Sequence, residues 1–356
     1  MANKIILQIG KYYPPNEGGI EKVSELISRA IFKSSTNYFI GFNSNKSTKV
    51  RRGVYGEVII EFGLDIKLAS QPISLTLLFY LNKLIKRISP TLIIFHHPNP
   101  ILSFFDKKYQ YLIWNHGKIN VNRGLYKLYI NYEKKLFSKS KAVFHSTPTI
   151  IRSDNHNNII SPFCIDETLF LESKKPKIPL KKFLFTYCRH VKYKGLDVLI
   201  EAFKKSEYSG SLVIGGIGPE TNYLKGIAKN HNILFLGKIP YSEITWLLKN
   251  ADCFMFSSTN NSETFGFTLL EAMYNGCPIV KFEIKDSGAN WVCPSEVCIN
   301  SGPPGIENLT ESINKIIKTP RVELNKIGQS GKSRYSNFFS NDSVIKSLNR
   351  KINEFI

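Results

Sequence analysis

Short apolar segments alternate with segments of helical apolar spacing along the chain, and this alternation restricts the fold more than any other feature. The expected buried strands cover residues 4–9, 91–95, 111–114, 142–145, 183–186, 211–214, 233–235, 253–256 and 278–282. Helical spacing fills intervals between them, for example over residues 20–31, 75–88 and 125–137. Because neighbouring parallel strands are joined by crossover helices, this order predicts an α/β protein with parallel, doubly wound sheets.

The length of the chain and a break in its composition indicate two domains. A chain of 356 residues exceeds the size of one ordinary core. A stretch rich in lysine and proline covers residues 174–179, and the alternation begins again at residue 183. We therefore predict an N-terminal domain of residues 1–172, completed by a C-terminal helix at about residues 336–356, and a second domain of residues 173–335. Ligands are expected in a cleft between the domains, at the carboxyl ends of both sheets.

The net charge of +20 is concentrated in the first half of the chain. Residues 1–165 hold 23 basic against 9 acidic residues, whereas residues 166–356 hold 25 against 19. A basic half-molecule suits nucleic acid, an anionic membrane or an acidic substrate. No zinc-finger, homeodomain or RNA-recognition pattern accompanies the charge, so no nucleic-acid partner is expected.

Neither a signal peptide nor an apolar run of membrane-spanning length is evident, and the six cysteines show no disulfide or metal-binding pattern. We expect a cytoplasmic protein, with contact to the inner face of the plasma membrane as a further option. Residues 75–87 mix apolar and cationic side chains and form the candidate lipid-facing helix. The alternative is a core helix with a basic rim.

Two carboxylates, Glu263 and Glu271, are expected on a loop and on the helix that follows it. The helix should end near Gly276, because glycine is the usual residue just beyond a helix C-terminus. Between the two glutamates, the backbone N–H groups of the helix start would favour a phosphate. The residues concerned are Thr264, Phe265, Gly266 and Phe267. An ordinary helix with two solvated glutamates is the alternative.

Basic and glycine residues at other strand ends also suggest phosphate binding. Arg189 and Lys194 follow a predicted strand, and their side chains suit phosphate oxygens. The glycines in question are Gly18, Gly19, Gly216 and Gly218. Solvated cations and ordinary tight turns are the competing interpretations. Neither glycine segment completes the dinucleotide-binding fingerprint, and no phosphate-loop or nucleophile-elbow pattern is present, which disfavours a dehydrogenase, phosphoryl transfer and acyl transfer.

His116 is the best placed of the histidines, because it ends an apolar strand and precedes a glycine. A histidine in this position is either a catalytic group or a structural hydrogen-bonding group. His96 and His97 close another strand and could be taken for metal ligands. No cysteine or acidic partner stands at ligand spacing, so no metal site is expected.

Together these features resemble glycosyltransferase family 4, whose members have the two-domain GT-B fold. The matching segments are residues 13–21, 114–117, 162–166, 189 with 194–195, and 262–278, in the order found in the family. The resemblance implies that Glu271 holds the ribose and that Glu263, with the amides of residues 264–267, meets the donor sugar and its phosphate. It also implies that Arg189 and Lys194 neutralise the diphosphate and that His116 contacts the donor sugar. Residues 237–240 resemble the base-contacting loop, which includes Lys238 and Ile239.

The resemblance further implies a retaining, metal-independent hexosyltransferase that needs no cofactor. Its donor would be a GDP- or UDP-linked sugar, and its acceptor a glycan or a polyprenyl-linked glycan. Residues 286–292 resemble the subset that builds lipid-linked O-antigen or capsular chains, which favours a mannose-like hexose and surface polysaccharide synthesis. Cys188 and Gly117–Lys118 depart from the common family pattern and leave the acceptor open. The alternatives are a non-catalytic nucleotide-sugar-binding protein and, ranked lower, a nucleic-acid-binding protein.

Overall fold

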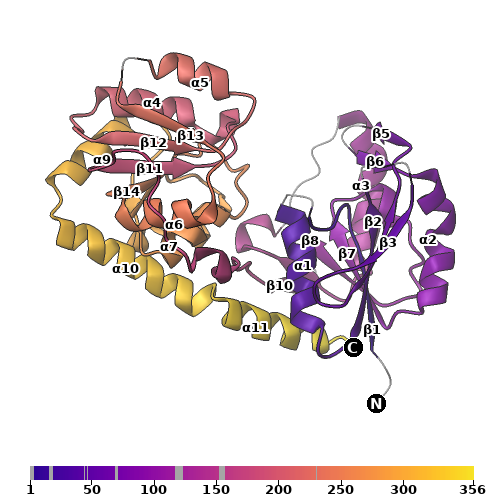
Figure 1. Ribbon diagram of the computed structural model, residues 1–356. Coiled ribbons are helices and arrows are strands. Elements are labelled where there is room, and N and C mark those ends of the chain that lie inside the picture. Colours follow the sequence, from indigo (N-terminus) through magenta and orange to yellow (C-terminus); the bar gives the residue numbers. More distant parts are fainter. Residues whose placement is uncertain are drawn as a thin grey trace. The chain divides into compact units, whose positions relative to one another are not determined.

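The computed structural model describes residues 4–15, 19–43, 45, 47–68, 71–116, 123–151, 157–229 and 231–356. The chain forms two compact units (Figure 1). Met1–Phe163 and Asp342–Ile356 make the first unit, and Cys164–Asn341 make the second. Among the described residues, no helix has the length and apolar character that crossing a membrane requires.

The main sheet of the first unit has the strand order β10-β9-β8-β7-β1-β2-β4-β3. Its strands are β1 Ile5–Ile9, β2 Thr36–Phe42, β3 Lys49–Arg52, β4 Val58–Phe62, β7 Leu92–His97, β8 Tyr111–Asn115, β9 Val143–His145 and β10 Asn158–Ile160. Neighbouring strands are parallel, except that β3 runs antiparallel to β4 at one edge. Every residue of β7 and β8 is buried, as expected for central strands of a parallel sheet covered on both faces.

Helices of the first unit pack on this sheet through apolar stripes. They are α1 Gly19–Ile31, α2 Leu75–Ile88, α3 Arg123–Ser138 and α11 Asn341–Asn353. Short elements complete the unit: β5 Ile66–Leu68 pairs with β6 Gln71–Ile73, and the 3₁₀ turns are η1 Ile101–Ser103 and η2 Pro148–Ile150. In α2, the residues Leu77, Leu81 and Ile85 recur at four-residue spacing and enter the core, while Ser74 caps the helix start.

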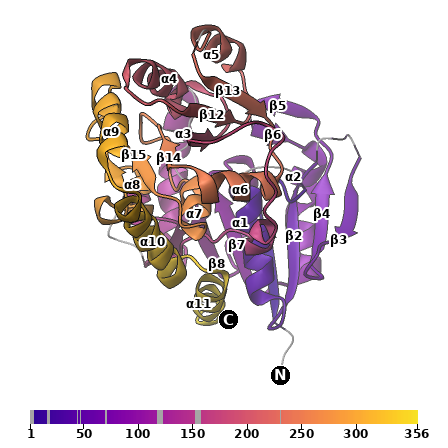
Figure 2. The same ribbon diagram turned by 60° about the vertical axis from the view of Figure 1, so that its left-hand side comes forward.

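The second unit has the strand order β13-β12-β11-β14-β15-β16, and all its neighbouring strands are parallel. Figure 2 shows β12, β13, β14 and β15 of this unit from a second side. The strands are β11 Phe183–Tyr187, β12 Ser211–Gly215, β13 Ile233–Gly237, β14 Cys253–Phe256, β15 Ile279–Lys281 and β16 Ile299–Asn300. The helices and 3₁₀ turns are η3 Glu167–Phe170, η4 Lys192–Lys194, α4 Leu196–Lys205, α5 Thr221–Ile227, α6 Tyr241–Asn250, α7 Phe267–Tyr274, α8 Gly288–Val292, η5 Ser295–Val297, α9 Ile306–Lys318 and α10 Arg321–Phe338.

The strand order of the second unit reverses direction between β11 and β14. From β11 the chain first adds β12 and β13 on one side, and it then returns to add β14, β15 and β16 on the other side. Successive connections therefore diverge beyond the carboxyl ends of β11 and β14. This is the topological switch point at which open parallel sheets bind ligands.

The predicted parallel, doubly wound architecture is confirmed in both units. The antiparallel β3–β4 pair and the small β5–β6 pair were not predicted. The units also divide after Phe163 and Asn341 rather than after residues 172 and 335. Contacts within the second unit explain the difference: the ring of Phe170 lies 5.2 Å from that of Tyr241, and the Glu167 Oε1 atom accepts a hydrogen bond of 2.8 Å from the Tyr335 hydroxyl.

Candidate functional site

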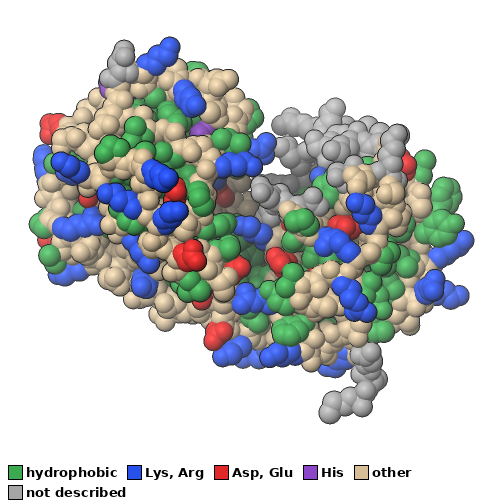
Figure 3. Space-filling model, in the orientation of Figure 1, with side chains coloured by type: hydrophobic (Ala, Val, Ile, Leu, Met, Phe, Trp, Pro, Cys, Tyr) green, Lys and Arg blue, Asp and Glu red, His purple; other side chains and the backbone are tan. Residues whose placement is uncertain are grey.

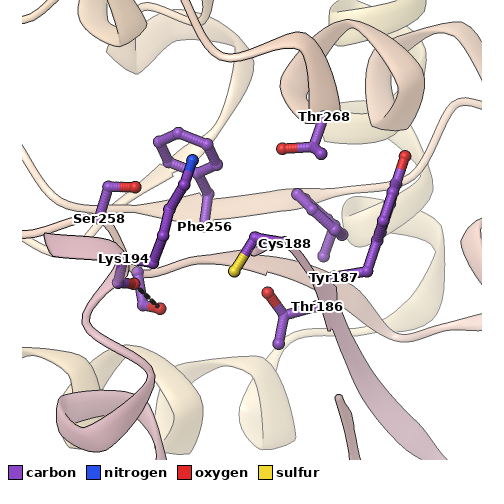
Figure 4. Close-up of a pocket in the computed structure, with 9 residues that line it drawn as sticks. Thr186, Tyr187, Cys188, Lys194, Phe256, Ser258 and Thr268 are labelled. Atoms are coloured by element: carbon purple, nitrogen blue, oxygen red, sulfur yellow. Dashed lines mark hydrogen bonds between the residues drawn. The ribbon is translucent and has the colours of Figure 1, made fainter. Parts of the chain in front are cut away.

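A small pocket lies at the switch point of the second unit (Figure 4). Residues that end β11 and β14, the 3₁₀ turn η4 and the first turn of α7 line it. They are Thr186, Tyr187, Cys188, Lys194, Phe254, Phe256, Ser257, Ser258 and Thr268. The local sequence explains the arrangement: each strand is an apolar run that ends in polar residues at the same edge of the sheet.

Lys194 is held in this pocket by its own backbone. Its carbonyl oxygen accepts a hydrogen bond of 2.8 Å from the Ser257 hydroxyl. The next residue, Gly195, has φ +61°, and a Cβ there would lie 2.2 Å from the Ser257 carbonyl oxygen. Only glycine therefore allows η4 to lie this close to the end of β14.

The ammonium group of Lys194 forms an ion pair with the Glu263 carboxylate. The two side chains are only 13% and 15% exposed, so water screens the pair weakly. Burial acts to lower the pKa of Lys194, but the Glu263 carboxylate outweighs it and the pKa lies above its ordinary value. The lysine is therefore a fixed positive charge beside a carboxylate.

Glu263 and Glu271 occupy a loop and a helix, as predicted. Glu263 precedes α7, and Glu271 lies within that helix and is 4% exposed. Gly266 stands at the N-cap with φ +85°, which favours glycine. The ring of Phe265 is buried, and its centroid lies 5.5 Å from that of the Phe267 ring. This packing holds the loop that carries the backbone amides at the start of α7. Gly276, with φ +68°, follows the end of the helix, as predicted.

Close packing explains why Gly216 and Gly218 are glycines, without any contact to a ligand. A Cβ at Gly216, which has φ +99°, would lie 1.9 Å from the Cys188 carbonyl oxygen. A Cβ at Gly218 would lie 2.3 Å from the carbonyl oxygen of His190. The glycines thus allow the segments after β12 and β11 to touch, which fits the tight-turn alternative.

His190 was missed by the sequence analysis although it joins these two segments. Its Nε2 atom donates to the Gly215 carbonyl oxygen at 3.2 Å, and its Nδ1 atom lies 2.9 Å from the Thr221 hydroxyl. The side chain is fully buried. No pattern in the sequence marks it, because its partners lie on β12 and α5.

Arg189, Lys238 and Ile239 lie at the ends of strands of the same sheet. Arg189 is exposed and makes no ion pair or side-chain hydrogen bond with the part of the chain that the structure describes. Lys238 is exposed after β13. Ile239 packs against Gly215, where an added Cβ would meet the isoleucine Cδ1 atom at 2.4 Å.

His116, in the first unit, follows β8 and joins a buried polar group that sequence patterns did not predict. Its Nε2 atom lies 3.0 Å from the Nδ1 atom of His96, and the two ring planes are nearly parallel, at 11°, with centroids 5.3 Å apart. The Nε2 atom of His96 in turn lies 3.0 Å from the Oε1 atom of Gln8. Gly19 begins α1, and Gly18 lies outside the described residues.

Metal ligands do not gather anywhere in the described ranges: no group of three or more His, Cys, Asp or Glu side chains could hold an ion there. His97 instead contacts Glu133 at 2.6 Å and Asn115 at 3.3 Å.

Two doubly wound units of this kind are the architecture of the GT-B fold. The crystal structure of Anabaena HepE in complex with UDP and glucose has this fold, with a TM-score of 0.73, 16% identity, and coverage of 99% of this chain and 100% of that chain. Residues 170–334 match the family described as glycosyl transferases group 1.

Curated relatives agree with this match. O-antigen chain mannosyltransferase C of Escherichia coli is 24% identical, over 94% of this chain and 94% of its own length. D-rhamnosyltransferase WbpZ of Pseudomonas aeruginosa is 24% identical, over 80% of this chain and 78% of its own length. The prediction of a glycosyltransferase enzyme is confirmed, and such an enzyme transfers a sugar from a nucleotide sugar.

Proposed function

We propose that the protein is a retaining, metal-independent hexosyltransferase that moves a mannose-like hexose from a GDP- or UDP-linked donor to a glycan or lipid-linked glycan during surface polysaccharide synthesis. The O-antigen mannosyltransferase and the rhamnosyltransferase among its relatives support the product class. The UDP and glucose bound to the HepE structure support the donor class.

The ion pair of Lys194 and Glu263 at the switch point is the observation that carries the proposal. Departure of a nucleoside diphosphate from an anomeric carbon places growing negative charge on the leaving phosphate. A partly buried, fixed cation stabilises that charge more strongly than a solvated one does. When phosphate takes up the charge of Lys194, the Glu263 carboxylate is released to accept hydrogen bonds from sugar hydroxyls.

The remaining roles follow the family resemblance. Arg189 adds a second cation for the diphosphate, Glu271 receives the ribose, and His116 meets the donor sugar. The other donor-contacting residues of the proposal are Gly18, Gly19, Gly216, Gly218, Lys238, Ile239, Thr264, Phe265, Gly266 and Phe267. The charge on the leaving group is thus met by side chains and backbone amides of the chain itself.

Lys194→Met tests this proposal most directly. Removing a charge that acts mainly in the transition state should lower kcat about 100-fold or more. A thermal-shift screen of GDP- and UDP-sugars first identifies the donor, because a ligand that prefers the folded state raises its stability. Transfer is then measured as nucleotide release that depends on acceptor.

Lys192→Met is the matched control. Lys192 belongs to the same 3₁₀ turn, but its side chain is 74% exposed and pairs with Asp197. The control should keep wild-type turnover. A Lys194→Met enzyme that matched it in kcat would refute the role of the lysine, and Glu263→Gln supplies an independent measurement of the same site.

The proposed lipid-linked acceptor is supported by the outer face of α2. Large apolar residues on this helix are exposed: Leu75 55%, Leu78 41%, Phe79 78% and Tyr80 53%. Lys83, Lys86 and Arg87 are exposed on the same helix. Hydrophobic and basic side chains lie together at the right-hand edge of Figure 3, where Figure 1 shows α2. The opposite stripe enters the core, so α2 is both a core helix and an amphipathic surface helix.

Flotation with vesicles that contain anionic lipid tests the membrane contact. We expect salt-sensitive binding, because each basic residue near the surface contributes about 1 kcal/mol. Phe79→Ser should weaken binding, whereas Phe338→Ser, which alters a 53% exposed phenylalanine of α10, should not. Binding that ignores both salt and Phe79 would contradict the assignment of this face.

A further inference from the structure

Gln8, His96 and His116 form a line of side chains across one face of the first unit's sheet. They belong to β1, β7 and the end of β8, which are neighbouring strands. In the registers, Gln8 pairs with Ile94 and His96 pairs with Trp114, so Gln8, His96 and His116 follow each other on the same face at two-residue steps. Gln8 is fully buried and His96 is 2% exposed.

The contacts of Gln8 fix the orientation of its amide. Its Nε2 atom lies 3.1 Å from the Ser24 carbonyl oxygen and 2.9 Å from the Ser28 hydroxyl oxygen. A carbonyl oxygen only accepts hydrogen bonds, so the amide nitrogen must face Ser24. The Oε1 atom of Gln8 therefore faces the Nε2 atom of His96, 3.0 Å away.

This orientation determines which nitrogen of His96 carries the proton. Since the Gln8 oxygen can only accept, the Nε2 atom of His96 must donate. The Ser24 hydroxyl, 3.4 Å from the same nitrogen, lies on that side of the ring as well. Burial lowers the pKa of His96 to about 3, so the ring is neutral at neutral pH and its Nδ1 atom holds a lone pair.

The proton position of His116 follows from that of His96. The Nδ1 atom of His96 lies 3.0 Å from the Nε2 atom of His116 and can only accept, so Nε2 of His116 donates. Burial, and then the neighbouring His96 and His97, lower the pKa of His116 well below its ordinary value. A neutral His116 with a proton on Nε2 has an unprotonated Nδ1, which makes no hydrogen bond within the described ranges.

We propose that Gln8 and His96 are positioning residues that hold His116 as its Nε2–H tautomer, so that Nδ1 of His116 accepts a hydrogen bond from a hydroxyl group of the donor sugar. This inference rests on the proposed placement of the donor sugar at His116. It assigns His116 the role of a hydrogen-bond acceptor and excludes that of a proton donor to the leaving group. No proton passes along this line of side chains during the reaction, because Gln8 and His96 are neutral and are already hydrogen-bonded to each other.

Nuclear magnetic resonance on protein labelled with ¹⁵N-histidine tests the tautomer without any substrate. Long-range nitrogen–proton correlations distinguish the two neutral tautomers, and the signals lost in His116→Asn assign the residue. Wild type should show His116 with the proton on Nε2. Gln8→Leu, which removes the acceptor at similar size, should shift His116 toward a mixture of tautomers. A wild-type His116 with its proton on Nδ1 would overturn the proposal.

Kinetics with rescue variants tests the consequence for transfer. His96→Leu leaves the donor of His116 unpaired and should lower kcat/KM for the donor roughly tenfold or more. His96→Asn places an amide oxygen near the former Nδ1 position, so it should restore much of that loss. His145→Leu removes another buried imidazole of the same sheet, which lies outside the line of Gln8, His96 and His116, and should leave the His116 tautomer unchanged.

The two readouts separate failure of this inference from failure of the proposed function. Wild-type protein that transfers no hexose from any GDP- or UDP-sugar would contradict the proposed function, whatever the tautomer. Transfer by wild type, together with an unchanged kcat/KM in folded His96→Leu, would overturn the positioning role alone. Loss in His96→Leu without rescue in His96→Asn would also count against it, because steric support would then explain the effect.

Discussion

Several buried polar side chains of the first unit form hydrogen bonds with one another. The Ser28 hydroxyl receives hydrogen bonds from the amides of Gln8 and Asn37 at 2.9 and 2.8 Å. Polar groups are costly to bury without such partners. A histidine enclosed in the same network must therefore stay neutral, which makes it sensitive to acid.

The pKa of His96, lowered by burial to about 3, predicts loss of stability in acid. Below about pH 6.5 the imidazole binds a proton in the unfolded chain, whereas in the folded protein it stays unprotonated until about pH 3. The free energy of unfolding therefore decreases as the pH is lowered through this window, by about 1.4 kcal/mol per pH unit for one proton. Chemical denaturation between pH 7 and pH 5, followed by fluorescence, measures the slope. The pH dependence of the free energy of unfolding should be smaller in His96→Asn, by about one proton. Equal slopes in the variant and the wild type would show that the pKa of His96 is not lowered in the folded protein.

At the scale of single residues, the sequence indicated where the candidates lie along the elements but not which residues they contact. His116 and Lys194 were chosen because they follow predicted strands, and Glu263 because it lies on the loop before a helix; the structure has them in these places, and their roles stay predictions. Lys194 and Glu263 meet although 69 positions separate them, and Gln8 and His96 meet across 88. A pairing of this kind depends on strand order, which local patterns do not encode.

Two strand ends of the second unit carry glycines, but close packing requires the glycine at only one of them. Gly216 and Gly237 both have positive φ values, at the ends of neighbouring strands β12 and β13. They differ in their surroundings: a Cβ at Gly216 would overlap the Cys188 carbonyl oxygen, whereas nothing lies within 4 Å of a Cβ at Gly237.

Gly216→Ala and Gly237→Ala should therefore differ in stability. Gly237→Ala carries only the backbone strain of the left-handed region, about 1 kcal/mol. Gly216→Ala adds a clash with backbone that cannot move aside, so we expect a loss of about 3 kcal/mol or more. Urea denaturation of the two variants gives the comparison, and equal losses would show that the β12 turn adapts.

At the scale of elements, apolar runs predicted the central strands, whereas the edge strand β3 has no such run and was not predicted. Strands such as β7, β8 and β14 are buried throughout and read as continuous apolar segments. The edge strand β3 has the sequence Lys-Val-Arg-Arg and is mostly exposed, so it offers no apolar signal. Basic residues on such an edge also discourage pairing with other chains.

The molecule as a whole consists of two units with separate cores, and each holds its own tryptophan reporters. Trp114 lies in the first unit, while Trp246 and Trp291 lie in the second. If the proposed nucleotide site is correct, a nucleoside diphosphate without a sugar should bind the second unit alone.

UDP or GDP should then stabilise the second unit selectively. At a concentration of about 100 times Kd, a ligand raises the free energy of unfolding by about 2.7 kcal/mol. Denaturation of Trp114→Phe reports the second unit, and denaturation of the Trp246→Phe, Trp291→Phe double variant reports the first. Only the former midpoint should rise, and Lys194→Met should reduce the rise. An equal rise in both would mean that the units unfold together.

The chain enters the second unit after Phe163 and returns to the first at Asp342. Helix α11 then supplies Val344, Leu348 and Ile352 to the first unit, all at most 3% exposed. During translation these residues emerge from the ribosome only after the entire second unit has been made. The sheet of the first unit is synthesised early but lacks helix α11 until translation ends. All residues of the second unit are therefore available for folding before those of the first unit are.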